Sequence, residues 1–325
     1  MQPPKFWHRP PGLWSTLLSP LGAIYAAGTA QRLAKAKSIQ LEIPVICVGN
    51  INAGGTGKTP TVVAIVQRLL ALGHRPHIVS RGYGGSIKSA TRVDERAHNS
   101  DDVGDEPLLL AAFAPTWVSP DRTIGAQLAA SQGADVIVLD DGFQNPGLHK
   151  DLSLVVVDAA RGFGNGKVLP AGPLREPVSV GMKRADFVLS IGPKRAQNHF
   201  IQTWGAPSCP HLKGHLAPLQ TGMDWQDSRV LAFAGIGYPQ KFFSTLQELG
   251  ANVVKSEALD DHQPLSKPLM LRLENEAKLL GAQLVTTEKD ATRLPDEFRA
   301  KVLTIPVRLE IEDWSALDAA LTKIF

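Results

Sequence analysis

One glycine-rich segment, residues 49–60, constrains the fold of this chain most. It reads Gly-Asn-Ile-Asn-Ala-Gly-Gly-Thr-Gly-Lys-Thr-Pro and lies between an apolar run at 43–48 and a helical pattern at 59–72. Glycines between a strand and a helix let backbone N–H groups face a phosphate, and the helix N-terminus adds a favourable partial charge. The segment therefore predicts a phosphate-binding loop in a strand–loop–helix unit.

Individual positions of this loop have expected roles. Lys58 would reach the β- and γ-phosphates of a nucleotide, and the Thr59 hydroxyl would bind Mg²⁺. Asn52 replaces the first glycine of the usual pattern, and asparagine tolerates left-handed backbone conformations better than most residues. We therefore expect the phosphates of ATP to bind at Asn52, Ala53, Gly54, Gly55, Thr56, Gly57, Lys58 and Thr59.

Short apolar runs alternate with helical segments through most of the chain. Further runs occur at 77–79, 134–139, 152–157, 187–191, 230–233, 284–286 and 302–305. Near-continuous Val, Ile and Leu runs separated by helices indicate a mostly parallel sheet with helices on both faces. We predict an α/β, P-loop NTPase-like core at 39–222, with 197–227 as a linker or cover. A new strand–glycine–helix unit predicts a smaller C-terminal α/β domain at 223–325 that closes the ATP cleft.

The N-terminal segment, residues 1–38, has a different character. Residues 10–31 contain no charged side chain, and cations follow at 32, 35 and 37. Apolar residues recur at helical spacing and are Leu13, Trp14, Leu17, Leu18, Leu21, Ile24 and Tyr25. A secretory signal, a spanning helix and a stripe packed on the protein's own core are the alternatives. We favour an amphipathic helix at a membrane surface, because Trp and Tyr prefer the headgroup layer and cations flank them.

Composition limits the partners. The net charge of +3, with 43% hydrophobic and 20% charged residues, is typical of a globular chain. This mild basicity suits an anionic substrate or membrane but is too weak to indicate nucleic acid. Cys47 and Cys209 give no disulfide framework, which fits a reducing compartment. Cys209, His211 and His215 have metal-like spacing but lack a fourth ligand, so we expect no zinc site.

Carboxylates follow two of the predicted elements. The run at 136–139 ends in Asp140 and Asp141, as a metal-binding acid in a P-loop protein should, and either could bind Mg²⁺ directly or through water. Residues 102–107 place three carboxylates in a short turn, which by chemistry alone is a solvated acidic loop. Residues 80–85 follow a predicted strand, where ligands bind in doubly wound sheets, so Arg81 and Tyr83 are expected to contact substrate.

Six motifs occur together in this chain. They are residues 49–60, Asp102–Pro107, Asp140–Gln144, Leu169–Pro177, Asp261-His262 and Thr286–Asp290. In this order they resemble the motif series of the lipid A 4′-kinases, the tetraacyldisaccharide 4′-kinase family, from the N-terminal segment to about residue 293. The loop alone decides little, because many enzyme classes share it. The alternative is a membrane-associated regulatory or partitioning-type ATPase, although Ala53 stands where that class carries an extra lysine.

The resemblance implies a reaction and a location. The γ-phosphoryl group of ATP would pass to the 4′-hydroxyl of a tetraacylated glucosamine disaccharide 1-phosphate, giving lipid IVA, with Mg²⁺ as cofactor. The protein would be a monomer, peripheral or monotopic on the cytoplasmic face of the bacterial inner membrane.

The resemblance also implies roles for individual residues. Asp105 would be the catalytic base, with His262 as its partner and Lys58 on the phosphates, since a positioned carboxylate can accept the hydroxyl proton during transfer. The metal and water shell would include Thr59, Asp140, Asp141, Glu106, Gln144 and Glu176. Arg122 and Arg175 would neutralise phosphate, for which a bidentate guanidinium is suited.

Overall fold

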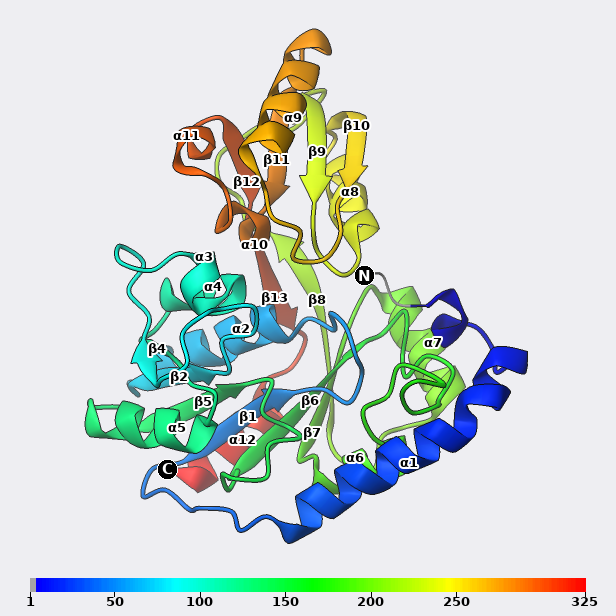
Figure 1. The fold of residues 1–325 in the computed structure, drawn as a ribbon, viewed down its shortest axis with the longest axis vertical. Helices are drawn as coiled ribbons and strands as arrows, with labels where there is room; N and C mark the ends of the chain where they lie inside the picture. The colour runs from blue at the N-terminus through cyan, green and yellow to red at the C-terminus, as the bar shows by residue number, and fades with distance from the viewer. Residues whose placement is uncertain (1–3) are drawn as a thin grey trace.

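A nine-stranded sheet organises the larger lobe of the molecule, whose structure is a computed structural model that describes residues 4–325 (Figure 1). Its strands, in spatial order, are β13 (Val307–Ile311), β8 (His211–Pro218), β7 (Phe187–Ile191), β6 (Leu152–Asp158), β1 (Val45–Gly49), β5 (Val136–Asp140), β2 (Pro76–Ser80), β4 (Thr116–Val118) and β3 (Thr91–Arg92). Neighbours from β8 to β4 pair in parallel, and the two edge strands are antiparallel. The predicted α/β class and mostly parallel sheet are confirmed.

Helices cover both faces of this sheet because its central strands are apolar on both sides. Along β1, Ile46 and Val48 point to one face, where α2 (Lys58–Ala71) and α12 (Ser315–Ile324) pack. Val45 and Cys47 point to the other face, toward α5 (Arg122–Ser131) and α7 (Lys194–Trp204). Successive strand residues alternate between faces, so a run that is buried throughout requires cover on both.

A smaller lobe is built on a second, four-stranded parallel sheet. Its spatial order is β10 (Asn252–Ala258), β9 (Arg229–Ala234), β11 (Gln283–Thr287) and β12 (Val302–Ile305). One face packs against α9 (Lys267–Leu279) and α11 (Asp296–Arg299), and the other packs against α8 (Pro239–Glu248). The short helix α10 (Glu288–Ala291) follows β11 and faces the larger lobe (Figure 1).

The path of the chain corrects two sequence predictions. After the smaller lobe the chain returns to the large sheet in β13, which pairs with β8, and α12 packs on that sheet. Residues 307–325 therefore belong to the larger lobe and not to a domain at 223–325. The segment 197–227 is not a linker either, since it contains most of α7 and all of β8. Both strands escaped prediction because each is only partly buried and has no continuous apolar run.

The N-terminal segment forms η1 (Lys5–His8) and the long helix α1 (Leu13–Lys35). Helix α1 packs on the larger lobe through small residues, and a Cβ on Gly22 would lie 2.9 Å from the Val168 carbonyl oxygen. Its large apolar side chains point outward, and Leu17 is 66% exposed. This polarity is the reverse of an ordinary surface helix, which buries its apolar stripe. Within residues 4–325, no helix has the length and apolarity needed to cross a membrane.

Candidate active site

The glycine-rich loop connects β1 to α2 at the carboxyl edge of the large sheet. Gly57 begins α2 in a left-handed conformation, with φ of 98°, and Gly54 has φ of 105°. Inside the loop, the buried side chain of Asn50 donates from Nδ2 to Thr56 Oγ1 at 3.0 Å. Because Asn50 fixes the loop from within while Gly54 and Gly55 are exposed, backbone N–H groups remain available to a phosphate.

Asn52 has a different role from the one expected. It does not adopt a left-handed conformation. Its backbone forms an antiparallel bridge with Leu174, and Ala53 N donates to Pro173 O at 2.7 Å. Its side chain donates to the Gly162 carbonyl oxygen at 3.0 Å. The long motif at 169–177 thus pairs with the phosphate-binding loop, which explains why an extended, proline-rich run accompanies it.

Asp140 ends β5 beside this loop. Its Oδ2 accepts a hydrogen bond from Ser80 Oγ at 3.0 Å, whereas Oδ1 is buried without a partner. Burial, with the negative charges of Glu106 and Asp141, raises the pKa of Asp140 to about 7. A buried acceptor without a donor is costly, so this oxygen is suited to a positive ligand.

Asp141 connects the phosphate-binding lysine to an arginine. Its carboxylate lies 3.8 Å from Lys58 Nζ and 2.9 Å from Arg175 Nη1. Burial alone would raise the pKa of Asp141, but Lys58 and Arg175 lower it below its ordinary value. Arg122 Nη2 donates to the Asp141 carbonyl oxygen at 3.0 Å. Arg122 is almost fully buried and its Nε has no partner, so it supports the turn through Nη2, and its expected contact with phosphate stays a prediction.

Gln144 and Glu176 lie next to this pair but are occupied by protein groups. Gln144 Nε2 donates to Glu176 Oε1 at 2.9 Å, and Gln144 Oε1 accepts from Arg175 Nη1 at 3.2 Å. Glu176 is 2% exposed and also binds the guanidinium of Arg184. The structure therefore places both residues beside Arg175, and their expected part in a metal and water shell stays a prediction.

The residues beside the loop fit a magnesium ion. Thr59 and the two aspartates at the end of β5 supply hydroxyl and carboxylate oxygens, the ligands that Mg²⁺ prefers. In the described part of the chain, no group of three His, Cys, Asp or Glu side chains could hold a metal alone. In proteins Mg²⁺ is commonly held by one or two carboxylates together with nucleotide phosphates and water. The unpartnered Asp140 Oδ1 is the oxygen that such an ion would satisfy.

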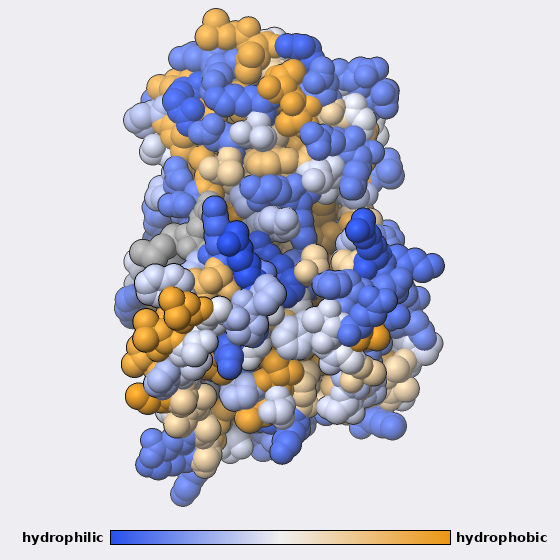
Figure 2. Space-filling model, turned by 90° about the vertical axis from the view of Figure 1, so that its right-hand side faces the viewer, coloured by the Kyte–Doolittle hydropathy of each residue, from blue (hydrophilic) through white to orange (hydrophobic). Residues whose placement is uncertain are grey.

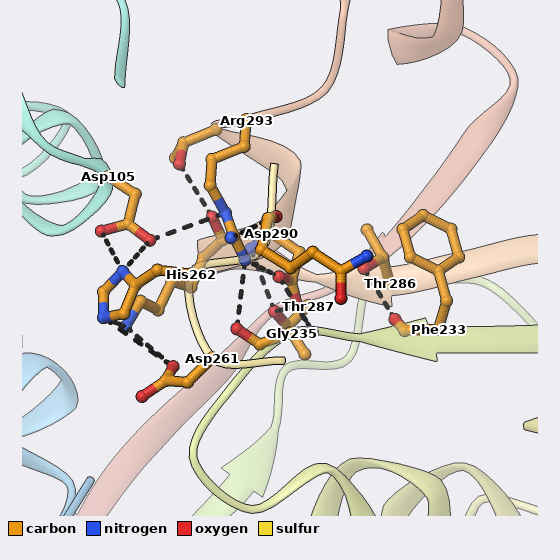
Figure 3. Close-up of polar contacts among 12 residues, drawn as sticks. Asp105, Phe233, Gly235, Asp261, His262, Thr286, Thr287, Asp290 and Arg293 are labelled. Atoms are coloured by element: carbon orange, nitrogen blue, oxygen red, sulfur yellow. Dashed lines mark hydrogen bonds and ion pairs between the residues drawn. The ribbon is translucent and has the colours of Figure 1, made fainter. Parts of the chain in front are cut away.

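A second cluster joins the two lobes (Figure 3). Asp105 is the first residue of α4 (Asp105–Ala111) in the larger lobe, and His262 follows β10 in the smaller lobe. His262 Nδ1 lies 2.9 Å from Asp105 Oδ2 and 3.1 Å from Oδ1. His262 has φ of 58°, a left-handed conformation that costs a non-glycine residue about 1–3 kcal/mol. Such strain persists only where the surrounding structure enforces it, and it is concentrated at functional sites.

Charges around this pair keep the carboxyl group ionised. Burial alone would raise the pKa of Asp105, but the hydrogen bond from His262 and the positive charges of Lys289 and Arg293 lower it. The same hydrogen bond raises the pKa of His262. Lys289 Nζ lies 3.3 Å from His262 Nε2 and 3.0 Å from Glu106 Oε1. Because lysine only donates, Nε2 accepts, and the proton on Nδ1 points to Asp105.

Arg293 fixes the loop that carries His262 (Figure 3). Its Nη1 donates to the Gln263 carbonyl oxygen at 2.8 Å, and its Nη2 donates to the Gly235 carbonyl oxygen at 3.1 Å and to Asp290. Arg293 Nε lies 3.6 Å from Asp105 Oδ2. The sequence predicts no role for Lys289 or Arg293, although residue 289 lies in the motif at 286–290.

Close backbone contacts place this pair beside the phosphate-binding loop. A Cβ on Gly237, in the turn after β9, would lie 3.4 Å from Gly55 N and 3.7 Å from Asp261 Oδ2. A Cβ on Gly104 would lie 2.6 Å from the Tyr83 carbonyl oxygen. This contact brings the exposed Tyr83 ring to 5.9 Å from the His262 ring, while Arg81 is exposed on the same loop.

Comparison with known proteins identifies the family. The model of the family described as tetraacyldisaccharide-1-P 4′-kinase matches residues 14–325. The chain belongs to this family. A relative from Jannaschia sp. named tetraacyldisaccharide 4′-kinase is 60% identical over 325 residues, covering 100% of this chain and 99% of the relative. A relative of the same name from Dinoroseobacter shibae is 60% identical over 330 residues, covering 100% and 98%.

A solved structure supports both the family and the fold. The crystal structure of the "apo" form of LpxK from Aquifex aeolicus in complex with ATP superposes with a TM-score of 0.78 at 27% sequence identity. The match covers 96% of this chain and 100% of the other. Membership of the tetraacyldisaccharide 4′-kinase family therefore extends over both lobes and α1.

Proposed function

We propose that this chain transfers the γ-phosphoryl group of ATP to the 4′-hydroxyl of tetraacyldisaccharide 1-phosphate, forming lipid IVA. The observation that carries the proposal is the pair of Asp105 and His262, formed between the lobes at 2.9 Å beside a phosphate-binding loop. A regulatory ATPase that only hydrolyses nucleotide has no need for a second lobe that delivers a histidine to a buried carboxylate.

The residues divide the reaction between them. The backbone of 54–57 and Lys58 bind the nucleotide phosphates, whereas Asn52 and Ala53 are held by the segment at 173–174. Asp105 accepts the proton of the sugar hydroxyl as the phosphoryl group moves. His262 donates its Nδ1 proton to Asp105 and thereby orients the carboxylate without neutralising it. Arg175 and Lys58 place two positive charges around Asp141 near the transferring group.

Magnesium would be held by Thr59, Asp140 and Asp141. When bound, it would neutralise charge on the β- and γ-phosphates, as in other P-loop enzymes. Glu106 takes part through its charge, which acts on Asp140, and through its ion pair with Lys289. EDTA should abolish transfer, and Mg²⁺ added in excess should restore it.

The substrate and α1 indicate where the enzyme works. The exposed apolar face of α1 and its terminal cations, Arg32 and Lys35, support peripheral attachment to the cytoplasmic face of the inner membrane. Figure 2, which faces the side where α1 lies, shows a strip of hydrophobic surface in the lower half of the molecule. A cavity of about 250 Å³ beside α1 suits an acylated substrate and is lined by Ala26, Ala27, Thr29, Ala30, Leu33, Glu176, Pro177 and Val180. Since one chain supplies the whole site, we expect a monomer.

The test is transfer of label from γ-labelled ATP to the disaccharide acceptor in mixed micelles. The wild-type protein should phosphorylate the lipid, and Asp105→Asn should lose transfer while still binding an ATP analogue. ATP hydrolysis without labelled lipid would refute the kinase proposal. Full transfer by Asp105→Asn would refute only the role of Asp105 as base.

A further inference from the structure

Arg184 sits at one end of a continuous line of polar side chains. It is the last residue of η2 (Met182–Arg184), which follows α6 (Val178–Gly181), and no motif of the sequence points to it. Its Nη2 binds Glu176 at 2.6 and 2.5 Å, and its Nη1 donates to the Phe143 carbonyl oxygen at 3.1 Å. The guanidinium also stacks on the Phe143 ring, 4.4 Å from its centroid. Arg184 thus binds both the buried carboxyl group of Glu176 and the backbone of Phe143, which follows the turn at Asp140 and Asp141.

Polar contacts continue from Glu176 through Gln144, Arg175 and Asp141 to Lys58, the lysine of the phosphate-binding loop. Gln144 Nε2 donates to Glu176 Oε1 at 2.9 Å, and Gln144 Oε1 accepts from Arg175 Nη1 at 3.2 Å. Arg175 binds Asp141 at 2.9 Å, and Asp141 lies 3.8 Å from Lys58 Nζ. Each of the four side chains between Arg184 and Lys58 therefore has a partner on both sides.

The order of donors and acceptors makes this line directional. A side-chain amide can turn over and exchange its oxygen and nitrogen, which would present a donor to the guanidinium of Arg175. Two acceptors prevent this, because Nε2 of Gln144 donates both to Glu176 Oε1 at 2.9 Å and to the Asn50 carbonyl oxygen at 2.8 Å. Glu176 is 2% exposed, and Arg184 is its cationic partner there, so the buried carboxyl group is held in a paired position.

We propose that Arg184 is a positioning residue for phosphoryl transfer, acting through Glu176 and Gln144 to aim Arg175 at Asp141. The proposal deepens the proposed function and rests on it. A buried ion pair that served stability alone would need neither the shared amide nor the second arginine. The geometry here connects the pair to Asp141, the residue that contacts the phosphate-binding lysine, through two hydrogen-bonded side chains, Gln144 and Arg175.

The test uses steady-state transfer by four variants, with the amount of folded enzyme counted by binding of an ATP analogue. Arg184→Lys keeps the positive charge but cannot bind Glu176 and the Phe143 carbonyl oxygen at the same time, as the guanidinium does. Glu176→Gln removes the carboxylate. The double variant Arg184→Met with Glu176→Gln leaves no buried charge unpaired, so it folds even if Arg184→Met alone does not. Lys183→Met, at the exposed neighbouring cation, is the matched control.

We expect Arg184→Lys to lower kcat about tenfold with little change in the KM for ATP, as for a lost hydrogen bond to a charged group. The double variant should be no slower than Glu176→Gln alone, because both changes break one line. Lys183→Met should match the wild type. Unchanged kcat in Arg184→Lys, or a double variant that is clearly slower than Glu176→Gln alone, would overturn the role of Arg184. A wild-type protein that binds the analogue but labels no lipid would instead defeat the proposed function.

Discussion

Replacing His262 by asparagine tests the catalytic pair most directly. Asparagine accepts the left-handed backbone that His262 adopts, so the loop keeps its conformation while the imidazole is lost. The change removes one hydrogen bond, of 2.9 Å, to the buried, ionised Asp105. Hydrogen bonds to charged groups contribute about 1.5–3 kcal/mol. At about 1.36 kcal/mol per factor of ten, kcat should fall by roughly 10- to 150-fold.

The comparison with Asp105→Asn sharpens this expectation. Loss of a general base lowers kcat by about 10²- to 10⁴-fold, so Asp105→Asn should be the slower variant. Since His262 acts only by orienting that base, the double variant should be no slower than Asp105→Asn alone.

The assay is steady-state labelling of the disaccharide, with binding of an ATP analogue measured in parallel. His199→Asn, at an exposed histidine on α7, is the control and should match the wild type. A His262→Asn enzyme with full kcat, or losses that multiply in the double variant, would refute the reasoning.

Three further outcomes are expected. The double variant Leu17→Glu, Leu21→Glu should bind phospholipid vesicles at least about tenfold more weakly in a sedimentation assay, because each exposed leucine contributes about 1.5–3 kcal/mol when it is buried in the membrane. The thermal midpoint of unfolding should not change. Gly104→Ala should destabilise the fold by about 1–3 kcal/mol in thermal unfolding, because φ at Gly104 is 91° and an added Cβ would lie 2.6 Å from the Tyr83 carbonyl oxygen. Gly133→Ala is the control for backbone strain alone, since φ is 95° there and no atom lies within reach of the added Cβ. The raised pKa of His262 means that its contribution to stability is complete below its unfolded value of 6.5 and is lost as pH rises through the folded value. The difference in thermal midpoint between wild type and His262→Asn should therefore shrink as pH rises above 6.5, and a difference that grows would contradict the assignment.

The sequence predicts the centre of the fold better than its margins. Strands β1, β5 and β6 are buried along their whole length and read as continuous Val, Ile and Leu runs. Strand β13 is an edge strand and β8 is its neighbour, both are only partly buried and include charged or histidine side chains, and β4 has only three residues. Such strands are defined by their neighbours, which single-chain periodicity does not reveal.

The sequence likewise predicts one part of the candidate site and misses another. The phosphate-binding loop is local, so glycines and a lysine in one segment reveal it. Asp105 and His262 lie 157 positions apart, and only the resemblance of their motifs suggested a pairing that the structure shows directly. The cations Lys289, Arg293 and Arg184 come from separate elements and act as partners of buried carboxylates. No spacing rule connects them, because their roles follow from how the lobes meet.

The return of the chain in β13 makes the smaller lobe an insertion, bounded by two strands that run side by side. The first half of β8 also pairs with β7, whereas its last residues pair with β13 alone. Both connections to the inserted lobe therefore leave the large sheet at one place, and the position of His262 relative to Asp105 depends on this single pair of strands.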